Sequence, residues 1–238
     1  MLSKLSGFAD STVVFDLDGT IVESLPDLAA TLNVILSREG VPCLPQDSIR
    51  ALVGQGARAL LIRGFEAAGV RLSPDRADAL FRDFIAYYSA HVADRSFVFP
   101  GVEAALDRLA AGGAKLAICT NKRTDLAVAL LRAVGLADRF AAIVGPDLAP
   151  AAKPDGRHVL KAVSLAGGDH RRAIMVGDSR ADADAARAAG LPVILVTFGY
   201  TDIPVHDLSP DVLITHFDDL PQACEQLLAA CPLTLDRL

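Results

Sequence analysis

Apolar residues along the chain follow two spacings, and their alternation predicts the fold class. Short continuous apolar runs, typical of strands buried on both faces of a parallel sheet, occupy residues 12–15, 115–120, 141–144, 173–176, 192–197 and 212–214. Between and after the later runs, apolar residues recur at the spacing of amphipathic helices. Helices are expected over 102–111, 124–134, 156–165, 181–189 and 220–230. Strands that alternate with helices predict an α/β fold with a doubly wound, Rossmann-like parallel sheet.

One long stretch interrupts this alternation directly after the first strand. A helix is expected from Leu25 to a stop at Gly40, and further helices over 47–53, 57–68 and 74–92, with almost no strand pattern between them. We therefore predict two domains. Residues 1–24 and 96–238 form the α/β core domain, and residues 25–95 form an inserted all-helical cap domain.

Composition and charge narrow the classes of function. Of the 238 residues 52% are hydrophobic and 22% are charged, as in ordinary globular proteins, and the net charge is -6. This balance argues against nucleic-acid or membrane-surface binding, and no apolar stretch has the length of a signal peptide or membrane span. The cysteines lack metal-type spacing, which favours reduced thiols and a cytoplasmic location. They are Cys43, Cys119, Cys224 and Cys231. A small phosphorylated metabolite remains compatible, because it needs only a few local cations, and we expect a monomer or homodimer.

Polar residues follow the expected strands at the edge where open α/β sheets bind ligands. The first strand is followed by Asp16 and Asp18, and the second by Thr120 and Asn121. The fourth is followed by Asp178, with Asp182 one turn further on, and Lys153 lies in the loop before it. Each has a bland explanation alone, since Asp178 can cap a helix and a loop lysine is usually solvated. The set is harder to dismiss, because every such explanation must hold independently.

These residue types suit phosphoryl transfer. Oxygen ligands of this kind favour Mg²⁺, and a lysine such as Lys153 would balance the acids and hold a phosphoryl oxygen. Thr120 and Asn121, or backbone amides near them, can donate to the other oxygens. One carboxylate can attack phosphorus and form an aspartyl-phosphate, and a second acid two residues on can protonate the leaving oxygen and then activate water.

The chain resembles the haloacid dehalogenase superfamily of phosphatases over nearly its whole length. Residues 16–20 (DLDGT), Thr120, Lys153 and residues 177–182 (GDSRAD) match the four motifs of that family in order and spacing. The resemblance implies Asp16 as nucleophile and Mg²⁺ ligand, and Asp18 as general acid and base with its backbone carbonyl on the metal. It also implies that Thr120 and Lys153 hold the phosphoryl group, that Asp178 ligates Mg²⁺, and that Asp182 supports the metal site from outside it.

Within the superfamily the likeness is greatest to phosphoglycolate phosphatases. It is carried by residues 52–58 (LVGQGAR), 100–102 (PGV), 198–200 (FGY) and 209–211 (SPD). Glu23 and Gly156 depart from the usual aspartate and proline of that group. The implied substrate is 2-phosphoglycolate. A phosphosugar phosphatase, a pyrophosphatase and a phosphomutase share the same core motifs and stay open.

The stretch from Gly54 to Arg58 has two readings besides a plain turn between helices. As a dinucleotide-binding fingerprint it fails, because a helix rather than a buried strand precedes it. As a specificity loop it would allow Arg58 to pair with a substrate carboxylate.

From another class, a phospho-acceptor signalling domain also combines acids, a threonine and a lysine around Mg²⁺. The spacing of Asp16 and Asp18 on one strand and the long helical insertion argue against it.

Overall fold

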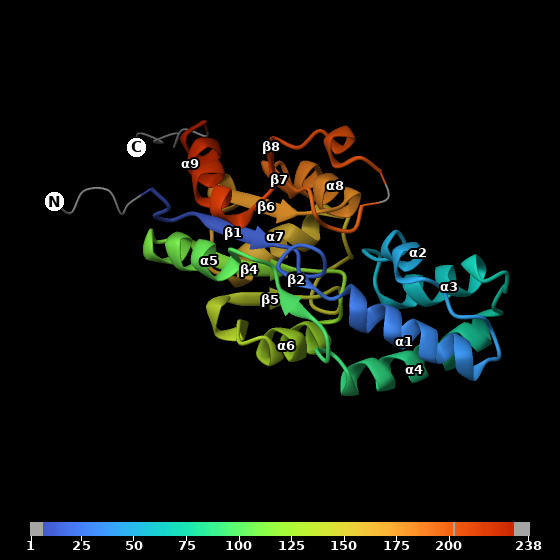
Figure 1. The fold of residues 1–238 in the computed structure, drawn as a ribbon. Coiled ribbons are helices and arrows are strands. Elements are labelled where there is room, and N and C mark those ends of the chain that lie inside the picture. Colours follow the sequence, from blue (N-terminus) through green and yellow to red (C-terminus); the bar gives the residue numbers. More distant parts are fainter. Residues whose placement is uncertain (1–6, 202, 231–238) are drawn as a thin grey trace.

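The computed structural model describes residues 7–201 and 203–230, and in this part of the chain six parallel strands form one sheet (Figure 1). In spatial order they are β5 (Ala142–Val144), β4 (Lys115–Cys119), β1 (Thr12–Phe15), β6 (Ala173–Gly177), β7 (Val193–Val196) and β8 (Val212–Ile214). The chain first builds outward from β1 on one side and then crosses to the other, so strand order reverses between β1 and β6. This is the order of a doubly wound sheet, and the predicted fold class is confirmed.

Helices cover both faces of the sheet, which explains why its strands are apolar throughout. One face carries α5 (Val102–Ala111), α6 (Thr124–Ala133) and α9 (Leu220–Ala230), and the other carries α7 (Gly156–Leu165) and α8 (Arg180–Ala189). In β1 the side chains of Val13 and Phe15 pack with the first layer and that of Val14 with the second. All three are fully buried, and burial of each stabilises the fold by about 1.5–3 kcal/mol.

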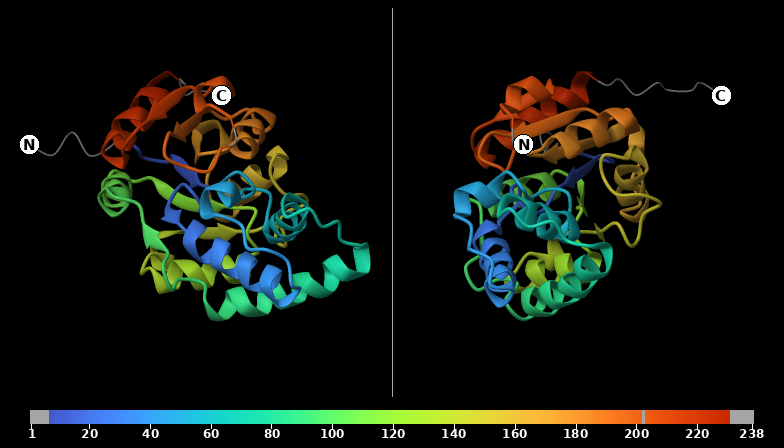
Figure 2. Two further views of the ribbon diagram at one scale, coloured as in Figure 1. Left: turned by 45° about the vertical axis from the view of Figure 1, so that its right-hand side comes forward. Right: turned by 90° about the vertical axis from the view of Figure 1, so that its right-hand side faces the viewer.

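From residue 25 to residue 90 the chain builds four helices that we call the helical insert. They are α1 (Leu25–Arg38), α2 (Gln46–Arg50), α3 (Ala57–Ala67) and α4 (Pro74–Ala90), and they lie together beside the sheet (Figure 2). Their facing sides share an apolar cluster that also includes Leu126 of α6 and Tyr200. The helix predicted over 47–53 was too long, because the chain leaves α2 at Ala51 and turns toward Gly54, whose φ of 108° lies in the left-handed region.

Two short strands connect the helical insert to the sheet, and the sequence did not predict them. β2 (Val22–Glu23) pairs antiparallel with β3 (Phe97–Val98), so the chain enters and leaves the insert at one place. The buried Asp27 carboxylate strengthens this junction, because it accepts hydrogen bonds from the backbone N–H groups of Arg95 and Ser96 and from the Ser96 hydroxyl. Both connections therefore lie close to the predicted boundaries at residues 24–25 and 95–96. The division into two domains stays a prediction.

Two further expectations concern membranes and cysteines. Within residues 7–201 and 203–230, no helix combines the length and the apolar character needed to cross a bilayer. Cys43, Cys119 and Cys224 are free thiols, the first exposed and the other two buried, and Cys231 lies outside the described residues.

The buried His158 on α7 should make the free energy of unfolding depend on pH. Its imidazole is fully buried, Nε2 donates to the Val144 carbonyl at 3.2 Å, and burial lowers its pKa to about 4. The unfolded chain, with a pKa near 6.5, takes up the proton first, so stability falls as the pH drops from about 6.5 toward 4. We expect a loss of about 1–2 kcal/mol at about pH 5 relative to pH 7.5. Urea unfolding at the two pH values measures this loss for wild type and for His158→Gln, which keeps an N–H donor but cannot titrate. The variant should lose less free energy of unfolding than wild type, and equal losses would contradict this account.

Candidate active site

At the carboxyl end of the sheet, a buried ammonium group joins two carboxylates from distant parts of the chain. Lys153 Nζ lies 2.8 Å from Asp16 Oδ1 and 2.6 Å from Asp182 Oδ1. Asp16 directly follows β1, Lys153 precedes α7, and Asp182 stands in the first turn of α8. Burial would lower the pKa of Lys153, but Asp16 and Asp182 raise it above its usual value. The group is therefore a fixed cation.

Asp178, the first residue after β6, is held by donors from two other loops. Its Oδ1 accepts from the Thr20 hydroxyl at 2.9 Å, and its Oδ2 accepts from the Tyr200 backbone N–H at 2.6 Å. The approach requires glycine at position 19, where φ is 82° and an added Cβ would lie 2.6 Å from Asp178 Oδ2. Burial, with the charges of Asp182 and Asp16, raises the pKa of Asp178 well above its usual value.

The arrangement of the three acids fits a divalent cation. Asp16, Asp178 and Asp182 each offer a carboxylate oxygen, and these oxygens lie within 4.8 Å of one another. Burial raises the pKa of Asp16 to about 7 despite the nearby Lys153. Three carboxylates face one ammonium group, so two negative charges remain unbalanced, and a hard dication suits such oxygen donors.

Asp182 differs from the other two acids in the number of its contacts, because among the described residues its carboxylate makes four, whereas that of Asp178 accepts two hydrogen bonds and that of Asp16 contacts Lys153. Its Oδ1 contacts Lys153, and its Oδ2 accepts from the Ser179 hydroxyl and from the backbone N–H groups of Asp178 and Ser179. This geometry favours Asp16 and Asp178 as direct ligands. Asp182 would then position Lys153 and the beginning of α8.

The second acid of the first motif has a cation of its own. Asp18 Oδ2 lies 3.0 Å from Nζ of Lys122, and its Oδ1 accepts from the Ser24 hydroxyl at 2.5 Å. Burial would lower the pKa of Lys122, but Asp18 and then Tyr88 raise it. Sequence reasoning missed Lys122, although a lysine two residues after Thr120 at the same strand end is a signal that could have found it.

Thr120 and Asn121 follow β4, as predicted, and both side chains have partners within the protein, since the Thr120 hydroxyl accepts from the Lys122 backbone N–H at 3.1 Å. Thr120 is 1% exposed and lines a cavity with Asp16 and Asp18. The Asn121 amide accepts from Lys153 N–H and donates to the carbonyls of Lys153 and Gly54. Asn121 therefore ties the Lys153 loop to the helical insert. Because its side chain is engaged in these contacts, Asn121 would contact the substrate through its backbone N–H, and this contact stays a prediction.

The cavity has a volume of about 230 Å³ and lies between the helical insert and the carboxyl ends of β1 and β4. Residues 53–58 form part of its wall, as a specificity loop would. Arg58 lines it too, but its guanidinium forms an ion pair with Asp78 at 2.5 Å, and both side chains are about half exposed. Binding a substrate carboxylate would require Arg58 to leave this partner.

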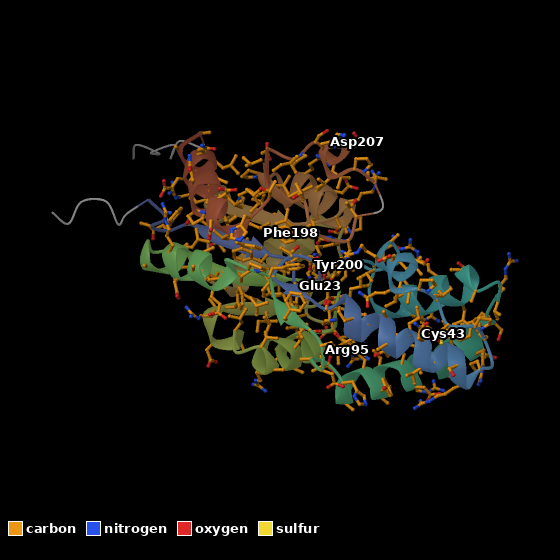
Figure 3. All side chains as sticks on the ribbon, in the orientation of Figure 1. Glu23, Cys43, Arg95, Phe198, Tyr200 and Asp207 are labelled. Atoms are coloured by element: carbon orange, nitrogen blue, oxygen red, sulfur yellow. The ribbon has the colours of Figure 1, made fainter. Side chains whose placement is uncertain are left out.

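Tyr200 links Asp178 to the beginning of the helical insert, a connection that sequence reasoning also missed. Its backbone N–H donates to Asp178, and its hydroxyl donates to Glu23 Oε1 at 2.5 Å and accepts from the N–H groups of Ser24 and Leu25. Figure 3 labels Glu23 and Tyr200, which lie side by side where the insert meets the sheet. The longer side chain of Glu23, where relatives were expected to have aspartate, therefore makes a specific contact.

Comparisons with known proteins agree with the resemblance inferred from the motifs. Residues 11–190 match the family described as haloacid dehalogenase-like hydrolases. The chain is 54% identical over 231 residues to phosphoglycolate phosphatase of Caulobacter vibrioides, covering 97% of this chain and 98% of that protein. It is 42% identical to phosphoglycolate phosphatase of Mesorhizobium japonicum, with 92% and 96% covered. The crystal structure of a predicted phosphoglycolate phosphatase from Haemophilus somnus has a TM-score of 0.83 at 30% identity, with 90% and 97% covered.

The Thr20 hydroxyl provides a test of the cation site. Thr20→Val keeps the buried volume but removes the donor to Asp178, so the affinity for a divalent cation should fall by about 10–100-fold. Thr20→Ser keeps a hydroxyl and should retain most of the affinity. Calorimetric titration of both variants with Mg²⁺ makes the comparison, and wild-type affinity in Thr20→Val would show that the hydroxyl does not orient a ligand.

Proposed function

The chain belongs to the haloacid dehalogenase-like hydrolase family and is a phosphatase, and from that premise we propose that it hydrolyses 2-phosphoglycolate to glycolate and phosphate. The observation that carries the proposal is the pairing of two acids with two separate cations beside one cavity. Asp16 contacts Lys153, and Asp18 contacts Lys122. This pairing supports Asp16 as the carboxylate that attacks phosphorus and Asp18 as the one that transfers the proton.

In the first step, a carboxylate oxygen of Asp16 attacks phosphorus. The bond between phosphorus and the glycolate oxygen breaks as the aspartyl-phosphate forms, and the carboxyl group of Asp18 gives its proton to the departing oxygen. In the second step, water attacks phosphorus, Asp18 takes the proton from this water, and phosphate departs. Asp16 is then a free carboxylate again and Asp18 has recovered its proton.

The surrounding residues hold the transferred group. Lys153 and Thr120 bind phosphoryl oxygens, with Lys153 kept in place by Asp182. We propose that Mg²⁺ is the cation, held by the side chains of Asp16 and Asp178 and by the backbone carbonyl of Asp18. Bound there, Mg²⁺ neutralises the excess negative charge of carboxylates and phosphate.

The helical insert supplies the remaining selectivity. We propose that residues 25–95 act as a cap domain whose loop from Gly54 to Arg58 closes over the substrate. Phosphosugar phosphatases, pyrophosphatases and phosphomutases would share the core chemistry and differ here. Family membership and the insert favour a phosphatase over a phospho-acceptor signalling domain. A monomer or homodimer and a cytoplasmic location stay predictions.

Asp16→Asn tests the nucleophile. An amide cannot form the aspartyl-phosphate, so kcat should fall by at least about 1,000-fold. The assay is multiple-turnover phosphate release from 2-phosphoglycolate, with Asp83→Asn, an exposed acid on α4, as the matched control. Robust turnover by Asp16→Asn would exclude the mechanism. Release that stops near one equivalent in wild type would favour a signalling domain.

A screen of phosphate esters tests the substrate and the cation together. We expect 2-phosphoglycolate to be turned over with the highest kcat/KM in a set that includes sugar phosphates and pyrophosphate. Activity should vanish with a chelator and return with excess Mg²⁺, because the buried acids then regain their counter-charge. A sugar phosphate at the top of the ranking would transfer the proposal to that class, and activity unaffected by the chelator would refute the metal assignment.

A further inference from the structure

Lys122 is a buried cation that contacts Asp18, and the mechanism above gives it no contact with the substrate. Its side chain is 5% exposed, and Nζ lies 3.0 Å from Asp18 Oδ2 and 3.0 Å from the Tyr88 hydroxyl. An ammonium group has three N–H donors, so one remains after these two contacts. Among the described residues no other acceptor contacts Nζ, and Lys122 lines the cavity. The third donor is therefore available to a ligand.

The position of Lys122 matches the shape of the proposed substrate. Asp18 protonates the departing oxygen, so the leaving group lies against Asp18 and its cation. In 2-phosphoglycolate the carboxylate carbon is two bonds of about 1.5 Å each from that oxygen. A carboxylate at this distance reaches an ammonium group that itself contacts Asp18.

The other cations near the cavity either contact two buried carboxylates or form ion pairs that are exposed to solvent. Lys153 already contacts two carboxylates. Arg58 is paired with Asp78 and Arg123 with Asp125, and these four side chains are about half exposed. Exposed ion pairs contribute little, whereas a charge-assisted hydrogen bond in a dry cavity is strong. Of the described residues lining the cavity, Lys122 is the buried cation best placed to bind an anion.

We propose that Lys122 is a specificity-determining residue that binds the carboxylate of the substrate's leaving group. The inference rests on the proposed function and names the residue that selects the substrate. Tyr88 of α4 holds the ammonium group in position, with its ring centroid 4.6 Å from Nζ. The helical insert thereby contributes to selectivity through a hydroxyl group, and Arg58 is not required for it.

The test compares 2-phosphoglycolate with ethyl phosphate, which has the same two carbons but no carboxylate. Wild type should favour 2-phosphoglycolate in kcat/KM by at least about tenfold, as expected for a hydrogen bond to a charged group. Lys122→Gln should lose most of this preference, chiefly through a higher KM for 2-phosphoglycolate. Lys122→Arg keeps a cation and should recover part of it. The control is Lys161→Gln on α7, outside the cavity lining, which should behave as wild type.

Other results would overturn the inference. If Lys122→Gln lowers kcat/KM for both esters by the same factor, Lys122 only orients Asp18. If Arg58→Gln abolishes the preference while Lys122→Arg retains it in full, Arg58 binds the carboxylate; this comparison decides even if Lys122→Gln does not fold. A wild type that hydrolyses both esters equally well refutes the inference and the substrate but leaves the phosphatase reaction. A wild type that hydrolyses neither refutes the proposed reaction as well.

Discussion

At the carboxyl end of β1, the buried ammonium group of Lys153 lies between the carboxylates of Asp16 and Asp182. Without this cation, acids from two neighbouring strand ends would repel one another in a region from which water is excluded. Removing one partner of such a buried pair typically costs about 3–5 kcal/mol, because it leaves an uncompensated charge. The remaining excess of negative charge is what makes the site suitable for a dication.

The rest of the sheet edge keeps these charged groups in register. The side chain of Asn121 forms hydrogen bonds with the backbone N–H and carbonyl of Lys153, which hold the loop before α7 against the end of β4. Asp182 is fixed by the first turn of α8, and Asp178 by Thr20 and Tyr200. All these elements meet where strand order reverses between β1 and β6, because only there can loops from both halves of the sheet converge on one point.

Besides the contact of Asn121 with Gly54, two links couple the acids of the site to the helical insert. Tyr200 connects Asp178 to the first residue of the insert, Leu25, and Lys122 connects Asp18 to Tyr88 of α4. Asp16 and Asp18 are two residues apart in the sequence, yet Asp16 is paired with Lys153 and Asp18 with Lys122. One of these cations is buried among the acids of the sheet edge, and the other is held by the insert. In the proposed mechanism, this separation allows one carboxylate to act on phosphorus while the other meets the leaving group.

The sequence alone determined the sheet, the edge that carries the polar residues and the family, because apolar spacing and strand-end motifs are local features. It predicted the polar residues that follow the strands at that edge, namely Asp16, Asp18, Thr120, Asn121, Lys153, Asp178 and Asp182. Only the tertiary structure paired Asp18 with Lys122, placed Tyr200 on Asp178 and joined Arg58 to Asp78. The strands β2 and β3 also escaped prediction, since two residues carry no periodicity. These contacts join segments far apart in the chain, and their partners are decided by packing between layers, which no local pattern records.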